Sequence, residues 1–243
     1  MLRLLSRLKH SPKTAPIRWY TNLLYYDKNM VNLDTRVVDI VQVDGYKWKM
    51  SDQINSLQKV EGNLWFSNIK KEDIGVDIGA NIGAITIPLA SRAKKVYSIE
   101  PLFYKELREN IVLNKLTNVE ILKYAIGTKS GEHIKIRFSS KEEIVPLLSF
   151  RDLKKSIGAQ IGWLKMDGEG CEWSFSPEEL EGIRELRIEF HIFRGQVKKC
   201  MGKYKEYIDW LIKKGYKIHI EVPKVGLDPY NLRNYILIAS LEK

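Results

Sequence analysis

The sequence predicts an α/β fold built on a seven-stranded, mostly parallel sheet that an antiparallel hairpin closes at one edge. From about residue 74, short apolar runs typical of buried strands alternate with helical segments. The last two predicted strands follow each other with no helix between them, which indicates an antiparallel pair. A chain of 243 residues is long enough for one such core and a small N-terminal extension.

Seven short segments are predicted strands because they are apolar and bounded by turn residues. In chain order they are residues 74–78, 95–99, 119–122, 163–166, 185–192, 216–222 and 235–241. The expected helices are residues 82–92, 103–114, 176–180 and 203–214. The third opens on Ser176-Pro177 with Glu179 at the capping-box position, and Gly215 stands where the fourth should end.

The chain is expected to divide at about residue 70, with an N-terminal extension at 1–69 and the α/β domain at 70–243. Within the extension, two alternating apolar runs flank Asp44-Gly45, a dipeptide that favours a β-hairpin. The first twenty residues carry five basic side chains, no acidic one, and leucines at helical spacing. We expect a short basic amphipathic helix there, which lies on RNA or an anionic membrane surface or packs on the domain.

Composition narrows the class of protein. The chain has no uncharged apolar run of 18 residues, so no transmembrane segment is expected. Cys171 and Cys200 have no Cys or His neighbours at metal-binding spacing, which argues against a zinc site or a disulfide framework and favours the reducing cytoplasm. The net charge of +10 fits either a polyanionic partner or a solvated, lysine-rich surface.

Residues 76–83 combine a buried strand, a glycine turn and the start of a helix. Glycines let the backbone approach a ligand closely, and the first N–H groups of a helix bind a carboxylate or phosphate. Asn81 stands where a residue that tolerates positive φ is needed. Glu100 ends the next strand, where an acidic side chain can accept both hydroxyls of a ribose. This combination predicts a nucleotide-like cofactor.

Four blocks carry a resemblance to a known family: residues 77–83, 99–101, 125–127 and 164–172. Over roughly residues 70 to 195 the sequence resembles the FkbM family of methyltransferases, in which the last block usually reads Lys-Ile-Asp-x-Glu-Gly-x-Glu. The resemblance implies a Rossmann-like class I methyltransferase fold, S-adenosyl-L-methionine as cofactor, and transfer of its methyl group to an oxygen atom of an acceptor that the sequence leaves unidentified.

The same resemblance implies roles for the cofactor residues. The loop from Gly79 to Gly83 should wrap the methionine part, Glu100 should hold the ribose, and residues around Ala125 should border the adenine, although no acidic adenine ligand stands beside Tyr124. The expected cofactor-binding residues are Asp77, Gly79, Ala80, Asn81, Gly83, Glu100, Pro101, Ala125 and Asp167.

Charged residues gather at the ends of predicted strands four and five. Asp167, Glu169 and Glu172 follow strand four, at the edge where ligands bind in this architecture. In strand five, a period of two puts Glu189 and His191 on one face, and polar side chains in a central strand need a partner or a function. We expect all five to be catalytic, with His191 taking the acceptor's proton and Glu169 or Glu189 orienting its ring.

No metal is expected to be required, because the sequence has no His/Cys cluster. Asp167, Glu169 and Glu189 nevertheless form a set of oxygen ligands that could gather a hard cation such as Mg²⁺.

The leading function is therefore O-methylation of a small molecule or glycan. The runner-up is methylation of a tRNA or rRNA base, because residues 103–118 resemble a segment of archaeal tRNA guanine methyltransferases and the charge agrees. Against it, residues 167–169 lack the Asn-Pro-Pro-like motif of those enzymes. A protein lysine methyltransferase and a non-catalytic nucleotide- or RNA-binding module remain open as further alternatives.

Overall fold

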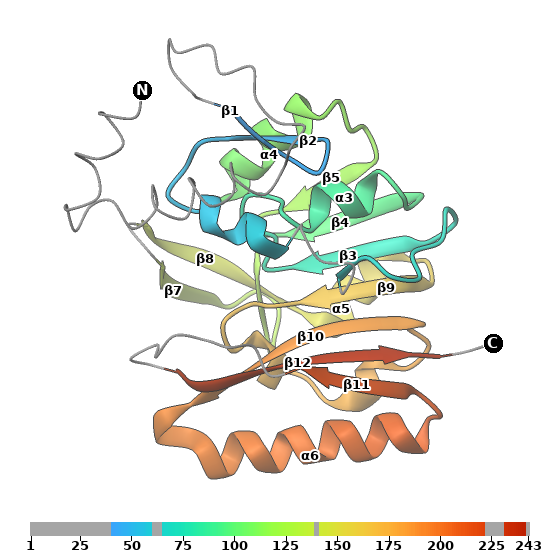
Figure 1. The fold of residues 1–243 in the computed structure, drawn as a ribbon. Coiled ribbons are helices and arrows are strands. Elements are labelled where there is room, and N and C mark those ends of the chain that lie inside the picture. The colour runs from blue at the N-terminus through green and yellow to red at the C-terminus, as the bar shows by residue number, and fades with distance from the viewer. Residues whose placement is uncertain (1–39, 60–64, 139–140, 222–230, 242–243) are drawn as a thin grey trace, which may run out of the picture.

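The computed structural model describes residues 40–59, 65–138, 141–221 and 231–241, and it contains a central seven-stranded sheet (Figure 1). The strand order across the sheet is β11-β12-β10-β9-β3-β4-β5. The strands are β3 (Ile74–Ile78), β4 (Lys95–Ile99), β5 (Val119–Leu122), β9 (Ile161–Met166), β10 (Glu185–Phe193), β11 (Lys217–Glu221) and β12 (Asn231–Ser240). The expected basic helix near the N-terminus lies outside the described residues.

The predicted fold class is confirmed by the pairing of these strands. Five strands run parallel, and β12 is antiparallel to both of its neighbours, β10 and β11. From β3 the chain builds outward to β5, then returns to the other side of β3 through β9. This reversal opens a crevice at the carboxyl ends of β3 and β9, the usual place for a ligand in such sheets.

The helices differ from the predicted ones in their lengths, and one of them, α5, was not predicted. They are α3 (Thr86–Ala90), α4 (Tyr104–Leu113), α5 (Phe150–Ile157) and α6 (Val197–Lys213). The expected helix at 82–92 is shorter because tight turns occupy its first residues, with the Gly83 N–H donating to the Ala80 carbonyl. The segment expected at 176–180 is the short 3₁₀ helix η5 (Pro177–Leu180), and the Ser176 N–H donates to Glu179 Oε2 as in a capping box.

One part of the fold is missing from the sequence prediction, namely a second sheet with the order β6-β8-β7. Its strands are β6 (Ala125–Gly127), β7 (His133–Phe138) and β8 (Lys141–Ser149), and α5 follows directly. Most of β7 is exposed and carries charged residues between its apolar ones, so it lacks the continuous apolar pattern of a buried strand. In Figure 1 this small sheet stands beside the central sheet.

Part of the polar face of β10 has a structural role, because Arg187 on that face forms buried hydrogen bonds. Arg187 is fully buried, and its guanidinium donates to Glu185 Oε2 at 3.2 Å and to Ser67 Oγ at 2.6 Å. A buried guanidinium with such partners avoids the penalty of an unpaired charge. Arg187 therefore belongs to the packing of the domain, whereas His191, four residues on, lies at the other end of the strand.

The hairpin expected around Asp44-Gly45 is present as β1 (Ile40–Val43) and β2 (Tyr46–Lys49). It packs on α4, where the Lys49 N–H donates to Asn110 Oδ1 at 2.8 Å and Trp48 is completely buried. The 3₁₀ helix η2 (Ile54–Lys59) follows. The hairpin is thus part of the packed body and closes one side of it.

Among the described residues, no helix combines the length and apolarity that crossing a bilayer requires.

We predict that Trp48→Ala lowers the free energy of unfolding of the whole domain by about 3–5 kcal/mol, because it leaves a cavity between the hairpin and α4. Urea unfolding followed by intrinsic fluorescence and by circular dichroism measures this loss. The exposed neighbour Lys47→Ala is the matched control. A loss within the control's error would mean that the hairpin is dispensable for the domain.

Candidate active site

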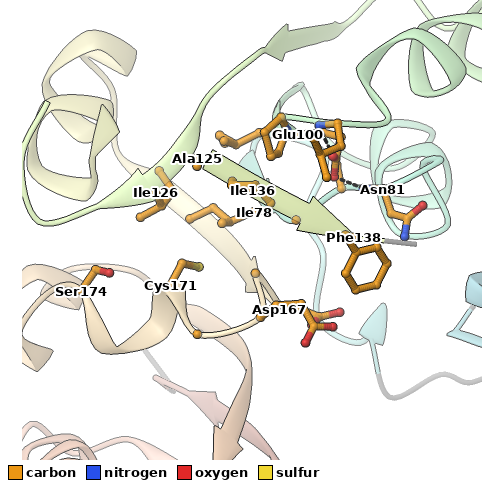
Figure 2. Close-up of a pocket in the computed structure, with 18 of the residues that line it drawn as sticks. Ile78, Asn81, Glu100, Ala125, Ile126, Ile136, Phe138, Asp167, Cys171 and Ser174 are labelled. Carbon is orange, nitrogen blue, oxygen red and sulfur yellow. Dashed lines mark hydrogen bonds between the residues drawn. The ribbon is translucent and has the colours of Figure 1, made fainter. Parts of the chain in front are cut away.

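A cavity of about 670 Å³ opens at the carboxyl edge of the central sheet, a volume typical of small-molecule sites. Figure 2 shows Glu100 at the top, Asn81 at the right, Asp167 and Cys171 below, and Ile136 and Phe138 of β7 between them in this view. The walls thus come from the loops after β3, β4 and β9, and from the small sheet.

The glycine loop after β3 touches the loop after β9 at backbone level. Gly79 has φ +73°, and a Cβ placed on it would lie 1.9 Å from the carbonyl oxygen of Asp167. Only glycine fits this position, because any side chain would collide with backbone. Asn81 adopts φ +51°, the left-handed conformation that asparagine tolerates, as the sequence suggested.

Glu100 fastens this loop to the end of β4. One of its carboxylate oxygens accepts the N–H groups of Leu102 and Phe103, at 2.8 and 3.0 Å, and the other accepts the Asn81 N–H at 2.7 Å. Burial raises the pKa of Glu100, and the three backbone hydrogen bonds oppose that rise. The side chain lines the cavity, so it serves the loop and is also open to a ligand.

Lys165 is a buried ammonium at the centre of the site. Its Nζ donates to the carbonyls of Ile78 and Gly79, at 3.1 and 2.7 Å, and lies 3.2 Å from Asp77 Oδ1. The same nitrogen is 3.8 Å from Asp167 Oδ2. Asp77 in turn accepts the hydroxyl of Thr86 through its other oxygen. One cation therefore connects the glycine loop with the acidic loop after β9.

The acidic loop and β10 meet around His191. Glu172 is fully buried, and its Oε1 accepts both the N–H of His191 at 2.8 Å and a ring contact from Nδ1 at 3.0 Å. Nε2 of His191 faces Asp167 Oδ1 at 3.7 Å and Glu169 Oε2 at 3.5 Å. The hydrogen-bonded orienter of the ring is thus Glu172, from the 3₁₀ helix η4 (Cys171–Trp173), rather than the expected Glu169 or Glu189.

These neighbours determine the charge of His191. Burial alone lowers the pKa of the imidazole, but the hydrogen bond and charge of Glu172, with the charges of Asp167 and Glu169, raise it to about 10. The ring therefore carries a proton at neutral pH. A protonated imidazole has no lone pair to accept another proton, so this geometry does not favour His191 as the general base expected from the sequence.

The structure separates the expected site residues into two groups. Those that line the cavity are Gly79, Ala80, Asn81, Glu100, Pro101, Ala125, Asp167 and Glu169. Those outside that lining are Asp77, Gly83, Glu172, Glu189 and His191. Asp77, Glu172 and His191 stand behind the lining and contact it through the bonds given above, whereas Glu189 is buried farther back on β10.

Several lining residues escaped the sequence analysis. On β7, Ile134, Ile136 and Phe138 face the cavity, and the alternation of apolar and basic residues in that segment is the signal that could have revealed them. On α6, Lys199 and Lys203 reach the mouth of the cavity. No pattern in the sequence connects that helix with the site, since only the fold brings its first turns there.

The sequence model of the methyltransferase FkbM domain family matches residues 77–218, which is more than half of this chain. The chain belongs to this family. The methyltransferase domain expected from the sequence is thereby confirmed.

More distant similarities cover small parts of the chain. It is 33% identical over 87 residues to a probable ribosomal RNA small subunit methyltransferase A of Methanosphaera stadtmanae. The aligned stretch is 35% of this chain and 30% of that protein. It is 53% identical over 53 residues to the tRNA(Phe) (4-demethylwyosine(37)-C(7)) aminocarboxypropyltransferase of Methanocaldococcus jannaschii, 20% of this chain and 21% of that one. The matches thus span less than a third of either relative.

Among solved structures, an rRNA methylase from Streptococcus thermophilus aligns with 77% of this chain and 93% of its own, at a TM-score of 0.47 and 14% sequence identity.

We predict that Lys165→Met lowers the free energy of unfolding by about 3–5 kcal/mol, because the buried Asp77 carboxylate loses its cation. Asp77→Asn in the same chain should restore part of that loss, since the stranded charge is removed. A double-mutant cycle by urea unfolding measures the coupling. A loss in the double variant equal to the sum of the losses in the two single variants would show that Lys165 and Asp77 are not energetically coupled.

Proposed function

We propose that the protein transfers the methyl group of S-adenosylmethionine to a hydroxyl oxygen of a small molecule or glycan, in the cytoplasm. The observation that carries this proposal is the acidic floor of the cavity, where Asp167 and Glu169 lie beside the glycine loop. The free cysteines Cys171 and Cys200 agree with a reducing compartment.

The cavity offers complementary groups to each part of the cofactor. The loop from Gly79 to Gly83 would hold the methionine end. Glu100 Oε2 accepts a hydrogen bond from Asn81 and retains a lone pair with which to accept a ribose hydroxyl. Ala125, with Ile136 and Phe138 on β7, provides the apolar surface that an adenine ring requires.

The carboxylates at the floor of the cavity can interact with both the methyl donor and the acceptor. Four carboxylates stand against two cations at the floor and directly behind it, so the excess negative charge favours the sulfonium and ammonium groups of the donor. The acidic groups are Asp77, Asp167, Glu169 and Glu172, and the cations are Lys165 and His191.

Methyl transfer then needs an oxygen nucleophile held in line with the carbon–sulfur bond. The acceptor oxygen forms a bond to the methyl carbon, the carbon–sulfur bond breaks, and the demethylated cofactor leaves as a neutral thioether. Glu169, whose side chain is 51% exposed, is the group placed to take the hydroxyl proton and pass it to water. His191 and Glu172 act as positioning residues, since they hold the loop without lining the cavity.

We predict that Glu100→Ala weakens binding of S-adenosylmethionine by about 1–3 kcal/mol, because ribose hydroxyls and backbone N–H groups lose their acceptor. Calorimetric titration measures the affinity, and circular dichroism verifies the fold. The exposed Glu109→Ala on α4 serves as control. Unchanged affinity in a well-folded variant would remove the ribose role.

We predict that Glu169→Gln lowers methyl transfer to the acceptor by about 10²–10⁴-fold, because the amide cannot accept a proton, and that cofactor affinity falls by much less. The assay follows labelled methyl transferred to fractionated cell extract, which also reveals the acceptor class. Glu142→Gln, on β8, is the matched control. Full transfer by Glu169→Gln would exclude this carboxylate as the base.

A second candidate, RNA methylation, is favoured by the basic residues at the mouth of the cavity. Arg137 of β7 and Lys199 of α6 are both exposed and line the opening. Lys203 lies beside Lys199 and donates to the Trp173 carbonyl at 2.8 Å. Positive side chains around an opening attract a phosphate backbone.

If RNA is the acceptor, unmodified tRNA should bind at low salt and lose affinity steeply as salt rises. Arg137→Ser and Lys199→Ser should each lower the slope of log affinity against log salt by about 1, one phosphate contact apiece. Fluorescence anisotropy of labelled tRNA measures both effects. Lys205→Ser, on the exposed side of α6, is the control. Absence of tRNA binding at low salt would exclude this candidate.

A further inference from the structure

Two side chains at the floor of the cavity and one directly behind it have the composition and spacing of a metal site. They are Asp167, Glu169 and His191, and each offers one ligand atom within 4.8 Å of the others. Nε2 of His191 lies 3.7 Å from Asp167 Oδ1 and 3.5 Å from Glu169 Oε2. Ligands bound at ~2.1 Å to one ion stand roughly 3.0–3.5 Å apart, so a small closure of the trio would suffice.

His191 provides an observation that is independent of the acidic side chains. Its ring is 99% buried, and Glu172 fixes its orientation through Nδ1. Nε2 is thereby directed into the gap between Asp167 and Glu169, at distances too long for hydrogen bonds. A histidine oriented by a carboxylate through one nitrogen, with the other nitrogen presented to a gap, is the arrangement that metal-binding histidines adopt.

Glu172 is itself held rigidly, which makes the histidine a pre-organised ligand. Its Oε1 accepts the N–H of His191, and its Oε2 accepts the N–H of Gly170 at 2.9 Å. The carboxylate therefore cannot rotate away without breaking backbone hydrogen bonds. Neither Glu172 nor the main chain of His191 needs to move when an ion enters the gap.

We propose that Asp167, Glu169 and His191 bind one divalent transition-metal ion. A nitrogen with two carboxylates suits Mn²⁺, Fe²⁺, Co²⁺ or Zn²⁺, whereas Mg²⁺ and Ca²⁺ prefer oxygen ligands throughout. The expected oxygen set included Glu189, and in the structure His191 takes that place. Binding of the ion releases the proton on Nε2 to water, so the imidazole coordinates as a neutral ligand.

The ion would add a Lewis acid at the cavity floor, where Asp167 and Glu169 line the opening. An acceptor hydroxyl bound to it would lose its proton more readily, because the cation stabilises the alkoxide. A carboxylate that coordinates through one oxygen has a second oxygen with which it could accept that proton, so Glu169 could combine both roles. The proposal concerns ion binding alone and does not depend on the nature of the acceptor.

The test is a titration of Mn²⁺ into the full-length protein after treatment with chelator, followed by the electron paramagnetic resonance signal of free Mn²⁺, with neither cofactor nor acceptor present. One ion per chain is expected. Glu169→Gln should weaken its binding at least ~10-fold, because a neutral amide replaces a charged ligand. Glu178→Gln, an exposed carboxylate on η5, should leave the affinity unchanged.

A second measurement identifies the nitrogen ligand and uses Co²⁺, whose visible spectrum reports the ligand set. His191→Gln should change that spectrum or abolish binding, and thermal unfolding establishes whether this buried variant is folded. Glu169→Gln, at a half-exposed position, carries the test if His191→Gln does not fold. The proposal is overturned if the wild type binds neither Mn²⁺ nor Co²⁺ at millimolar concentration, or if Glu169→Gln binds as the wild type does. Methyl transfer that proceeds fully in chelator would leave the proposed function standing and restrict the ion to a non-catalytic site.

Discussion

The site depends on one buried cation. Lys165 neutralises Asp77 and donates to the carbonyls of Ile78 and Gly79, so it satisfies the end of β3 from the neighbouring strand β9. A carbonyl left without a donor in this interior would cost about 1–3 kcal/mol. Through this contact, the glycine loop that would hold the cofactor and the acidic loop that would face the acceptor are kept in one fixed relation. The edge of the sheet that carries the site is therefore held together by a contact between two strands and not by a single loop.

Two buried carboxylates, Glu100 and Glu172, likewise fix the backbone around the site through hydrogen bonds. Glu100 accepts one backbone N–H group after β3 and two after β4, and Glu172 accepts the N–H groups of Gly170 and His191. Each buried carboxylate thus accepts backbone N–H groups at the edge of the sheet, where they would otherwise need another partner. Side chains fix the loops around the cavity. The polar atoms that face the opening are chiefly those of Asp167 and Glu169, and these can contact ligands.

The sequence predicts the central sheet well and the small sheet not at all. Strands such as 74–78 and 95–99 are mostly apolar because both of their faces are covered, and that pattern is visible in a single sequence. Strand β7 is exposed over most of its length and alternates apolar with charged residues, so its sequence resembles that of a polar loop. Asp167, Glu169, Glu172 and His191 were expected near one another from strand order, and they are. That Glu172 bonds to His191 could not be predicted, because it depends on the turn of η4 and not on the phase of β10.

The contact between Gly79 and the Asp167 carbonyl has a thermodynamic consequence. Because the two loops meet backbone to backbone, with no side chain between them to absorb a shift, a ligand that displaces one loop must displace the other. The donor and the acceptor would then influence each other's affinity, and linkage requires the two effects to be equal in size. Coupling between the two binding events is thus expected from a position where the chain can carry no atom beyond the backbone.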